Sequence, residues 1–398
     1  MFKDISSVSL AFLYVNILGF FFHSIVSRSL GPAGYGEFMV LYSFMLVVGN
    51  ITALLSTVGV KTLVENLSNK FEVLRSLRQY GIFIGAFFAF IACIMSPVFK
   101  NFLNVTEIYY FFIIAFIWLG MFSLAVERSF LQATGRFRVY AFSTAFECTI
   151  KLLAAIIATY IGLKIGGVLS ASAVAIFLSL LFLVSINREL WGKKIKLSIK
   201  KMIKIAVYVS PSGLFVYADD IFIRRIFDSH TAGLFASASI IGKILIWFSL
   251  SILAIYFPKF VHSKTSSALK KFALQMFGIV LIIELGAQVV FFIIGKPLFL
   301  MLFGSKFEPA LQFIPYYFLA ILPLIIDMIF ISLATAVEKG LTLIYIHLIV
   351  FYSLFIFLSF SSIFDYLEYI FSINLFFFFL YLWMFKKEIF ITNKDSQH

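Results

Sequence analysis

The sequence predicts an all-α polytopic membrane protein with about twelve transmembrane helices arranged as two six-helix halves. Hydrophobic residues make up 62% of the 398-residue chain and charged residues only 13%, whereas a soluble domain averages about 45–50% and about 25%. Apolar runs of about 20 residues, long enough to cross a bilayer, follow one another along the chain. Short landmarks of the first half return about 200 residues later, which indicates an internal repeat.

Each predicted span is an apolar run that ends near charged residues, glycine or proline. The first-half spans cover residues 8–27, 38–60, 80–99, 108–126, 141–161 and 165–187. The second-half spans cover residues 205–227, 234–258, 272–295, 311–336, 341–360 and 370–385.

Lysine and arginine are distributed unequally between the two sides of these spans. One side, with both chain ends and alternate loops, holds 23 of the 32, and the opposite loops hold 7. The positive-inside rule therefore predicts a multi-pass protein with both termini in the cytoplasm. Basic loops facing anionic lipid also explain the net charge of +13 better than binding to nucleic acid does.

The longest basic loop, residues 188–204, lies at the middle of the chain and has the composition of a linker or membrane-surface helix. It divides the chain into a predicted N-terminal six-helix lobe, residues 1–187, and a C-terminal lobe, residues 205–398. Three landmarks recur in order, with AGYG returning as AGLF, SPVF as KPLF, and ATGRF as ATAVEKG. Because six is even, the repeats are parallel, and transporters built this way bind substrate between their halves.

Seven charged residues lie inside the predicted spans, where each costs about 2.5–3.5 kcal/mol at a helix centre and therefore marks a protein-facing or wet position. They are Glu147, Lys151, Asp219, Asp220, Lys243, Glu284 and Asp327. Internal pairing is one interpretation, because Glu147 with Lys151 and Asp220 with Arg224 have i, i+4 spacing, and Lys243 is expected at the depth of Asp219 and Asp220. Ion coupling at Asp219, Asp220, Glu147 or Asp327 is the other.

The seventh span, SPSGLFVYADDIFIRR, begins with a proline and a glycine that weaken a helix. Tyr217, Asp220 and Arg224 lie on one stripe of it, and the first span carries Asn16 and His23 on a similar stripe. Interrupted helices at matching positions of two repeats indicate a transport site.

Catalytic and energy motifs are absent from the sequence. There is no G-x-x-x-x-G-K-[ST] loop for ATP, no His/Cys cluster with metal-ligand spacing, and no outward loop long enough for a catalytic domain. A transporter is therefore predicted rather than an enzyme, with no catalytic residue, no metal and no cofactor beyond a coupling H⁺ or Na⁺. The charges in the spans suit either an anionic headgroup held by the cations or a small cation at the acids.

The stretch RSLGPAGYGEF after the first span resembles the arginine–x–leucine–glycine–proline…tyrosine–glycine signature of Wzx-type polysaccharide flippases. These O-antigen and capsule transporters belong to the multidrug/oligosaccharidyl-lipid/polysaccharide (MOP) superfamily, which has the MATE-like fold. The segments DDIFIRRIFDSHTAGLFASA and LQATGRF are similar to further segments of that family, although Phe235 replaces a usual tyrosine. The residues that carry the signature match are Arg28, Leu30, Gly31, Pro32, Tyr35 and Gly36.

The resemblance implies transfer of an undecaprenyl-diphosphate-linked oligosaccharide from the cytoplasmic to the periplasmic leaflet of the bacterial inner membrane. The diphosphate would lie near Lys151, Lys243 or the outer arginines Arg28, Arg224 and Arg225. Tyr217 and Tyr35 could stack on sugars. The implied partners are the lipid-linked oligosaccharide, membrane lipids, and a polysaccharide polymerase with its chain-length regulator.

Three alternatives stay open. The first is a multidrug or small-solute exporter of the same fold, driven by H⁺ or Na⁺. The second is a major-facilitator carrier, disfavoured because the loop after the second span lacks a G-x-x-x-D-R pattern. The third is a polysaccharide polymerase, which would be expected to carry a large outward loop.

Overall fold

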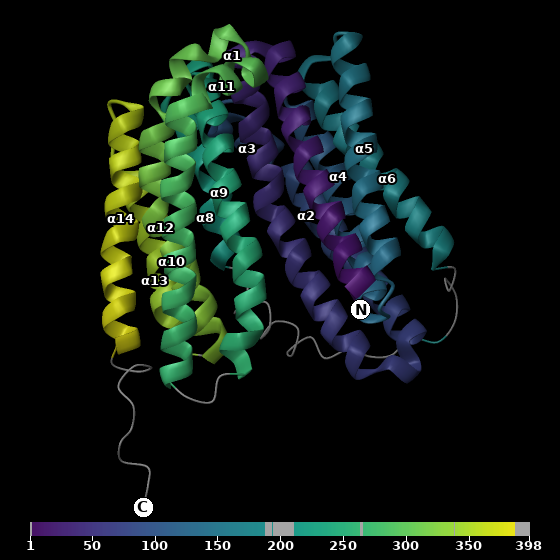
Figure 1. The fold of residues 1–398 in the computed structure, drawn as a ribbon. Coiled ribbons are helices and arrows are strands. Elements are labelled where there is room, and N and C mark those ends of the chain that lie inside the picture. Colours follow the sequence, from purple (N-terminus) through teal and green to yellow (C-terminus); the bar gives the residue numbers. More distant parts are fainter. Residues whose placement is uncertain (1, 188–192, 194–210, 263–265, 338, 387–398) are drawn as a thin grey trace, which may run out of the picture. The chain divides into compact units, whose positions relative to one another are not determined.

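The structure is a computed structural model that describes residues 2–187, 193, 211–262, 266–337 and 339–386. Within these residues all regular structure is helical (Figure 1). The chain divides into two compact units, unit 1 from Met1 to Gly233 and unit 2 from Leu234 to His398. The predicted linker, apart from residue 193, lies outside the described residues, and the division into two six-helix lobes stays a prediction.

Unit 1 begins with two helical stretches that meet at Gly31 without a loop, carry the single label α1, and cover the first two predicted spans. Helix α1 runs from Phe2 to Glu65 and changes direction at Gly31, where φ is 66° and ψ is 177°. Pro32 follows, so the kink combines a left-handed φ that favours glycine with a residue that cannot donate a backbone hydrogen bond. The predicted break is therefore confirmed as a kink rather than a loop.

The remaining helices of unit 1 pack around α1. They are α2 (Lys70–Ile94), the short α3 (Ser96–Leu103), α4 (Tyr109–Ala133), α5 (Phe137–Tyr160), α6 (Lys164–Ile186) and α8 (Pro211–Ile226). Helix α4 is central, because it packs against α1, α2 and α6. Helix α8, predicted as the first span of the second lobe, packs against α1 and belongs to unit 1.

Apolar side chains hold the unit 1 helices together along their length. One fully or nearly buried cluster joins α1, α2 and α4 through Leu63, Val73, Leu77, Phe122 and Phe130. Burying a side chain of this size from water contributes about 1.5–3 kcal/mol, but in a bilayer close packing supplies much of the attraction instead.

Unit 2 contains most of α9 (Ser229–His262), then α10 (Ser266–Val290), α11 (Lys296–Phe303), α12 (Ile314–Val337), α13 (Leu341–Phe357) and α14 (Ile363–Phe385). A π-helical turn, Phe291–Gly295, joins α10 to α11, and a 3₁₀ segment, Ser305–Gln312, precedes α12. Helix α12 packs between α10 and α14. The landmarks SPVF and KPLF form the same element in the two copies, an eight-residue helix with proline in its first turn.

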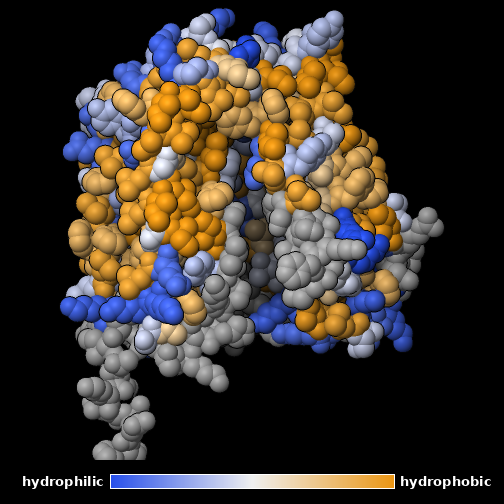
Figure 2. All heavy atoms as spheres, viewed as in Figure 1, coloured by the Kyte–Doolittle hydropathy of each residue, from blue (hydrophilic) through white to orange (hydrophobic). Residues whose placement is uncertain are grey.

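Nine helical segments of the described chain are long and apolar enough to cross a membrane. One of them, Leu13–Glu65, covers two predicted spans, and α8 and α13 coincide with two further predictions but are shorter than 18 residues. Figure 2 shows apolar side chains along the middle of the helices and hydrophilic ones near their ends. These observations identify a multi-pass membrane protein.

Candidate functional site

A cavity of about 240 Å³ lies inside unit 1, among α1, α4, α5 and α6. Apolar side chains such as Met45, Leu124 and Ile176 form part of its wall. Charged and polar side chains form the rest, and they include Tyr42, Arg128, Tyr140, Glu147, Lys151 and Ser172. The cavity therefore brings three charged groups together at positions within candidate membrane spans.

Arg128 and Glu147 form an ion pair in the cavity wall. Arg128 Nη2 lies 2.7 Å from Glu147 Oε2 and also donates to the carbonyl oxygen of Ser143 at 3.2 Å. The sequence suggested instead that Glu147 pairs with Lys151, one turn further along α5. The carboxylate pairs with a guanidinium from α4 because α4 continues to Ala133, past the end of its apolar run.

Lys151 is held by aromatic rings. Its Nζ lies 4.6 Å from the centroid of the Phe22 ring, 5.7 Å from that of the Tyr42 ring and 3.4 Å from the Tyr42 hydroxyl oxygen. Such cation–π contacts contribute about 0.5–2 kcal/mol each, which is less than a buried ammonium loses in hydration. The cavity wall holds two cations, Arg128 and Lys151, and one carboxylate, Glu147, so it carries one excess positive charge.

A second polar group joins α8 to α1. Asp220 is 4% exposed, and its Oδ2 accepts a hydrogen bond from the Ser43 hydroxyl at 2.7 Å. Asp219 Oδ1 accepts from the backbone N–H of Asp220 at 2.9 Å. Arg224, the predicted i+4 partner of Asp220, donates to backbone carbonyls instead, and Tyr217 is partly buried. The predicted pairing of Asp220 with Arg224 is therefore replaced by a contact between helices.

His23 also has a partner close to this group. Its Nδ1 lies 3.1 Å from the hydroxyl oxygen of Tyr35, across the kink of α1. Both side chains are buried. The hydrogen bond therefore stabilises the geometry of the kink.

Contacts of Arg224 and Arg225 fasten the end of α8 to α3 and the turn that follows it. Arg224 donates to the carbonyl oxygens of Asn104 and Phe227, and the Arg225 guanidinium lies 5.6 Å over the Phe102 ring. Glu37, at the start of the second part of α1, accepts hydrogen bonds from the backbone N–H and hydroxyl of Thr106 at 2.5 and 2.7 Å. Arg28, before the kink, is exposed.

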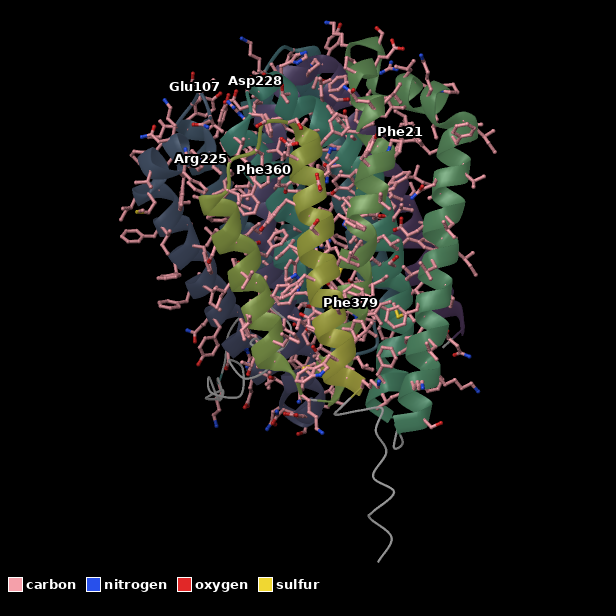
Figure 3. All side chains as sticks on the ribbon, turned by 90° about the vertical axis from the view of Figure 1, so that its left-hand side faces the viewer. Phe21, Glu107, Arg225, Asp228, Phe360 and Phe379 are labelled. Atoms are coloured by element: carbon pink, nitrogen blue, oxygen red, sulfur yellow. The ribbon has the colours of Figure 1, made fainter. Side chains whose placement is uncertain are left out.

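Asp228 caps the first turn of α9, at the same end of unit 1 as the labelled Glu107 and Arg225 (Figure 3). Its carboxylate accepts from the Thr231 hydroxyl at 2.6 Å and from the backbone N–H groups of Thr231 and His230 at 3.1 and 2.8 Å. These bonds, with the Thr231 hydroxyl foremost, hold the pKa of the Asp228 carboxyl below its usual range.

The two copies of the glycine landmark touch each other. The backbone of Gly36 lies so close to α9 that a Cβ would overlap the carbonyl oxygen of Ser229, and a Cβ on Gly233 would overlap the carbonyl oxygen of Pro32. Only glycine fits at either position without a shift of backbone. The conspicuous stretch after the first span is thus a helix-crossing point.

A buried clamp joins four helix ends at the opposite end of unit 1. Arg78 Nε and Nη2 donate to the two carboxylate oxygens of Glu127 at 2.5 and 3.0 Å. Asn187 donates to Glu127 at 2.9 Å and accepts from Arg136 at 3.1 Å. Glu127 is 1% exposed, so its charge depends on these partners.

The described part of unit 2 contains three further buried charged residues. Lys243 on α9 is 1% exposed, and Asp327 on α12 is fully buried. Both carboxylate oxygens of Asp327, and both of Glu284 on α10, have no hydrogen-bond partner among the described residues. The predicted pairing of Lys243 with Asp219 or Asp220 would join residues of different units and stays a prediction.

The sequence model of a family described as a polysaccharide biosynthesis protein matches residues 25–312, more than half of the chain. The chain belongs to this polysaccharide biosynthesis family. None of the curated proteins compared with it is similar enough in sequence to match.

Solved structures of membrane transporters share the fold of this family member. An inward-facing MATE multidrug transporter matches with a TM-score of 0.77 at 12% identity, over 96% of this chain and 98% of that one. The lipid II flippase MurJ matches with 0.72 at 14% identity, over 96% and 87%. The MATE transporter DinF-BH matches with 0.70 at 13% identity, over 98% and 97%. The predicted MATE-like, all-helical fold is therefore confirmed.

Among the predicted site residues of this family member, the structure brings Glu147 and Lys151 into one cavity. Asp219, Asp220, Arg224 and Tyr217 follow one another along α8. Lys243 and Asp327 belong to unit 2. Sequence reasoning missed Arg128, which it assigned to a loop because a charge marked the end of an apolar run.

Proposed function

We propose that this protein is a flippase that moves an undecaprenyl-diphosphate-linked oligosaccharide, an O-antigen or capsule repeat unit, across the bacterial inner membrane. The movement is from the cytoplasmic to the periplasmic leaflet, by alternating access between two lobes. The supporting observation is the cationic cavity of unit 1 in a chain of the polysaccharide biosynthesis family. The MurJ neighbour, described as a lipid II flippase, is consistent with a lipid-linked substrate.

In this proposal the cavity receives the diphosphate and the first sugar. Lys151 supplies a compact positive charge and Arg128 a planar guanidinium that can bind phosphate through two parallel hydrogen bonds. Tyr42 and Tyr140 offer aromatic faces and hydroxyl groups to a sugar ring. Arg28, Arg224, Tyr217 and Lys243 are the further proposed substrate contacts.

Asp327 is the proposed site for a coupling H⁺ or Na⁺, with Glu284 as a second acid. A buried carboxylate without a hydrogen-bond donor is costly, so it is expected either to be protonated or to hold a cation. Asp219, Asp220 and Glu147 are weaker candidates, because each carboxylate accepts a hydrogen bond that satisfies part of its charge. The same unpartnered acids also favour the alternative function, an H⁺- or Na⁺-coupled multidrug or small-solute exporter.

The orientation follows from the charge bias, with both termini in the cytoplasm. Reporter fusions after Lys70 and after Lys200 should both give a cytoplasmic signal. A periplasmic signal at either position would reverse or disprove the proposed topology.

Deletion of the gene distinguishes the two functions. The flippase proposal expects loss of surface polysaccharide and accumulation of lipid-linked repeat units in the inner leaflet, restored by the wild-type gene. A polysaccharide polymerase and its chain-length regulator are the proposed partners downstream, so polymer length should also recover. Normal surface polysaccharide together with sensitivity to small toxic solutes would support the exporter instead.

A further inference from the structure

The unit 1 cavity holds one carboxylate between two cations. Glu147 is 2.7 Å from Arg128 of α4 and one helical turn before Lys151 of α5. Side chains at i and i+4 lie about 5–6 Å apart at their Cβ atoms. The Glu147 carboxylate can therefore reach either cation by a change of side-chain rotamer, without movement of the backbone.

Only one of the two possible ion pairs is formed. Arg128 has the carboxylate, whereas Lys151 contacts the Tyr42 and Phe22 rings and the Tyr42 hydroxyl. Lys151 can therefore exchange these aromatic contacts for an ion pair with a carboxylate. The side chains of Arg128 and Glu147 are 18% and 24% exposed, so a ligand in the cavity can approach the pair.

The cavity also offers an unused hydrogen-bonding group. The hydroxyl oxygen of Ser172, in the same wall, is buried and has no hydrogen-bond partner among the residues that the structure describes. Ser172 is 3% exposed. A buried hydroxyl without a partner is costly, and a phosphate oxygen would satisfy it.

We propose that Glu147 exchanges partners when a phosphate-bearing ligand binds, leaving Arg128 to the phosphate and pairing with Lys151. This inference rests on the proposed function, because it takes the diphosphate of the lipid carrier as the ligand. The exchange keeps the carboxylate paired in both states, so binding leaves no uncompensated charge in the cavity. When Glu147 returns to Arg128, it displaces the phosphate. The Glu147 carboxylate therefore weakens binding of the ligand and speeds its release.

The test uses the purified full-length protein in lipid nanodiscs, with farnesyl diphosphate and inorganic pyrophosphate as probes. Glu147→Gln should bind farnesyl diphosphate about tenfold more tightly than wild type and release it more slowly, because a competing charge is removed. Arg128→Gln should weaken binding by about tenfold or more. Glu107→Gln removes the same charge from an exposed position outside the cavity and serves as the matched control.

Tighter binding is a result that a merely structural role of Glu147 would not produce, because loss of packing weakens binding. If Glu147→Gln is unstable, Glu147→Asp shortens the side chain by one methylene, frees Arg128 and should also tighten binding, by a smaller factor. Unchanged or weaker binding by both variants, with wild-type binding intact, overturns the exchange but not the proposed function. Failure of the wild-type protein to bind either probe overturns the proposed ligand and the exchange with it.

Discussion

Replacement of Gly233 by alanine tests the crossing of α1 and α9. An added Cβ would overlap the carbonyl oxygen of Pro32, and it would lie 2.7 Å from the carbonyl carbon of Pro32 and 3.0 Å from the backbone nitrogen of Gly36. All three atoms belong to the backbone, so no side chain can rotate away. The two helices must separate to accept the methyl group.

The expected cost follows from two opposing effects. Overpacking costs about 1–3 kcal/mol, and the upper end applies because backbone atoms must move. Alanine gains about 1 kcal/mol over glycine in helix propensity. The net loss in free energy of unfolding is therefore about 2 kcal/mol, a change of roughly 30-fold in the equilibrium between folded and unfolded protein.

Thermal unfolding of the purified protein in detergent measures this loss. Gly233→Ala should lower Tm by several degrees, and Gly36→Ala should behave in the same way because its Cβ would meet Ser229 and Gly233. Gly19→Ala is the matched control, since its Cβ would meet no atom within 4 Å. A Tm for Gly233→Ala equal to that of the control would refute the close crossing.

Two further predictions concern polar contacts at helix ends. Glu127→Gln should lower the free energy of unfolding by about 3 kcal/mol, because it leaves the Arg78 guanidinium without its counterion; an unchanged Tm would contradict the clamp. Asp228→Ala should cost about 1 kcal/mol through loss of the α9 cap. Because the pKa of Asp228 is below its ordinary 3.8, this contribution is complete above about pH 4 and declines as the pH falls through the lowered pKa. Thermal unfolding of wild type and Asp228→Ala should therefore converge in acid, and a constant difference would contradict the cap.

The sequence predicted the fold class well because hydropathy measures the length of a membrane span directly. It located the boundaries of helices less well, for a definite reason. A hydropathy window ends at the first charged residue, whereas the helix continues toward the aqueous phase. Thus α2 begins at Lys70, although the span was predicted from residue 80, and α4 extends through Arg128 to Ala133.

The site was only partly predictable from the sequence. Helical spacing correctly placed Glu147 and Lys151 on one face of a helix, and it could not show that Arg128 competes for the carboxylate. The contact between Ser43 and Asp220 joins residues 177 positions apart, which no local pattern reports. Similarly, the sequence predicts that the glycine landmark belongs to a repeat, but the contact between its two copies depends on tertiary packing.

The central claim is transbilayer movement of a diphosphate-linked glycan, and a reconstituted flipping assay measures it most directly. Proteoliposomes would carry a fluorescent undecaprenyl-diphosphate oligosaccharide, and its appearance in the opposite leaflet would be followed by a membrane-impermeant quencher. Wild-type protein should accelerate this movement over protein-free vesicles, and the double variant Arg128→Gln/Lys151→Met should not. Movement by the wild-type protein at the protein-free rate would contradict the claim.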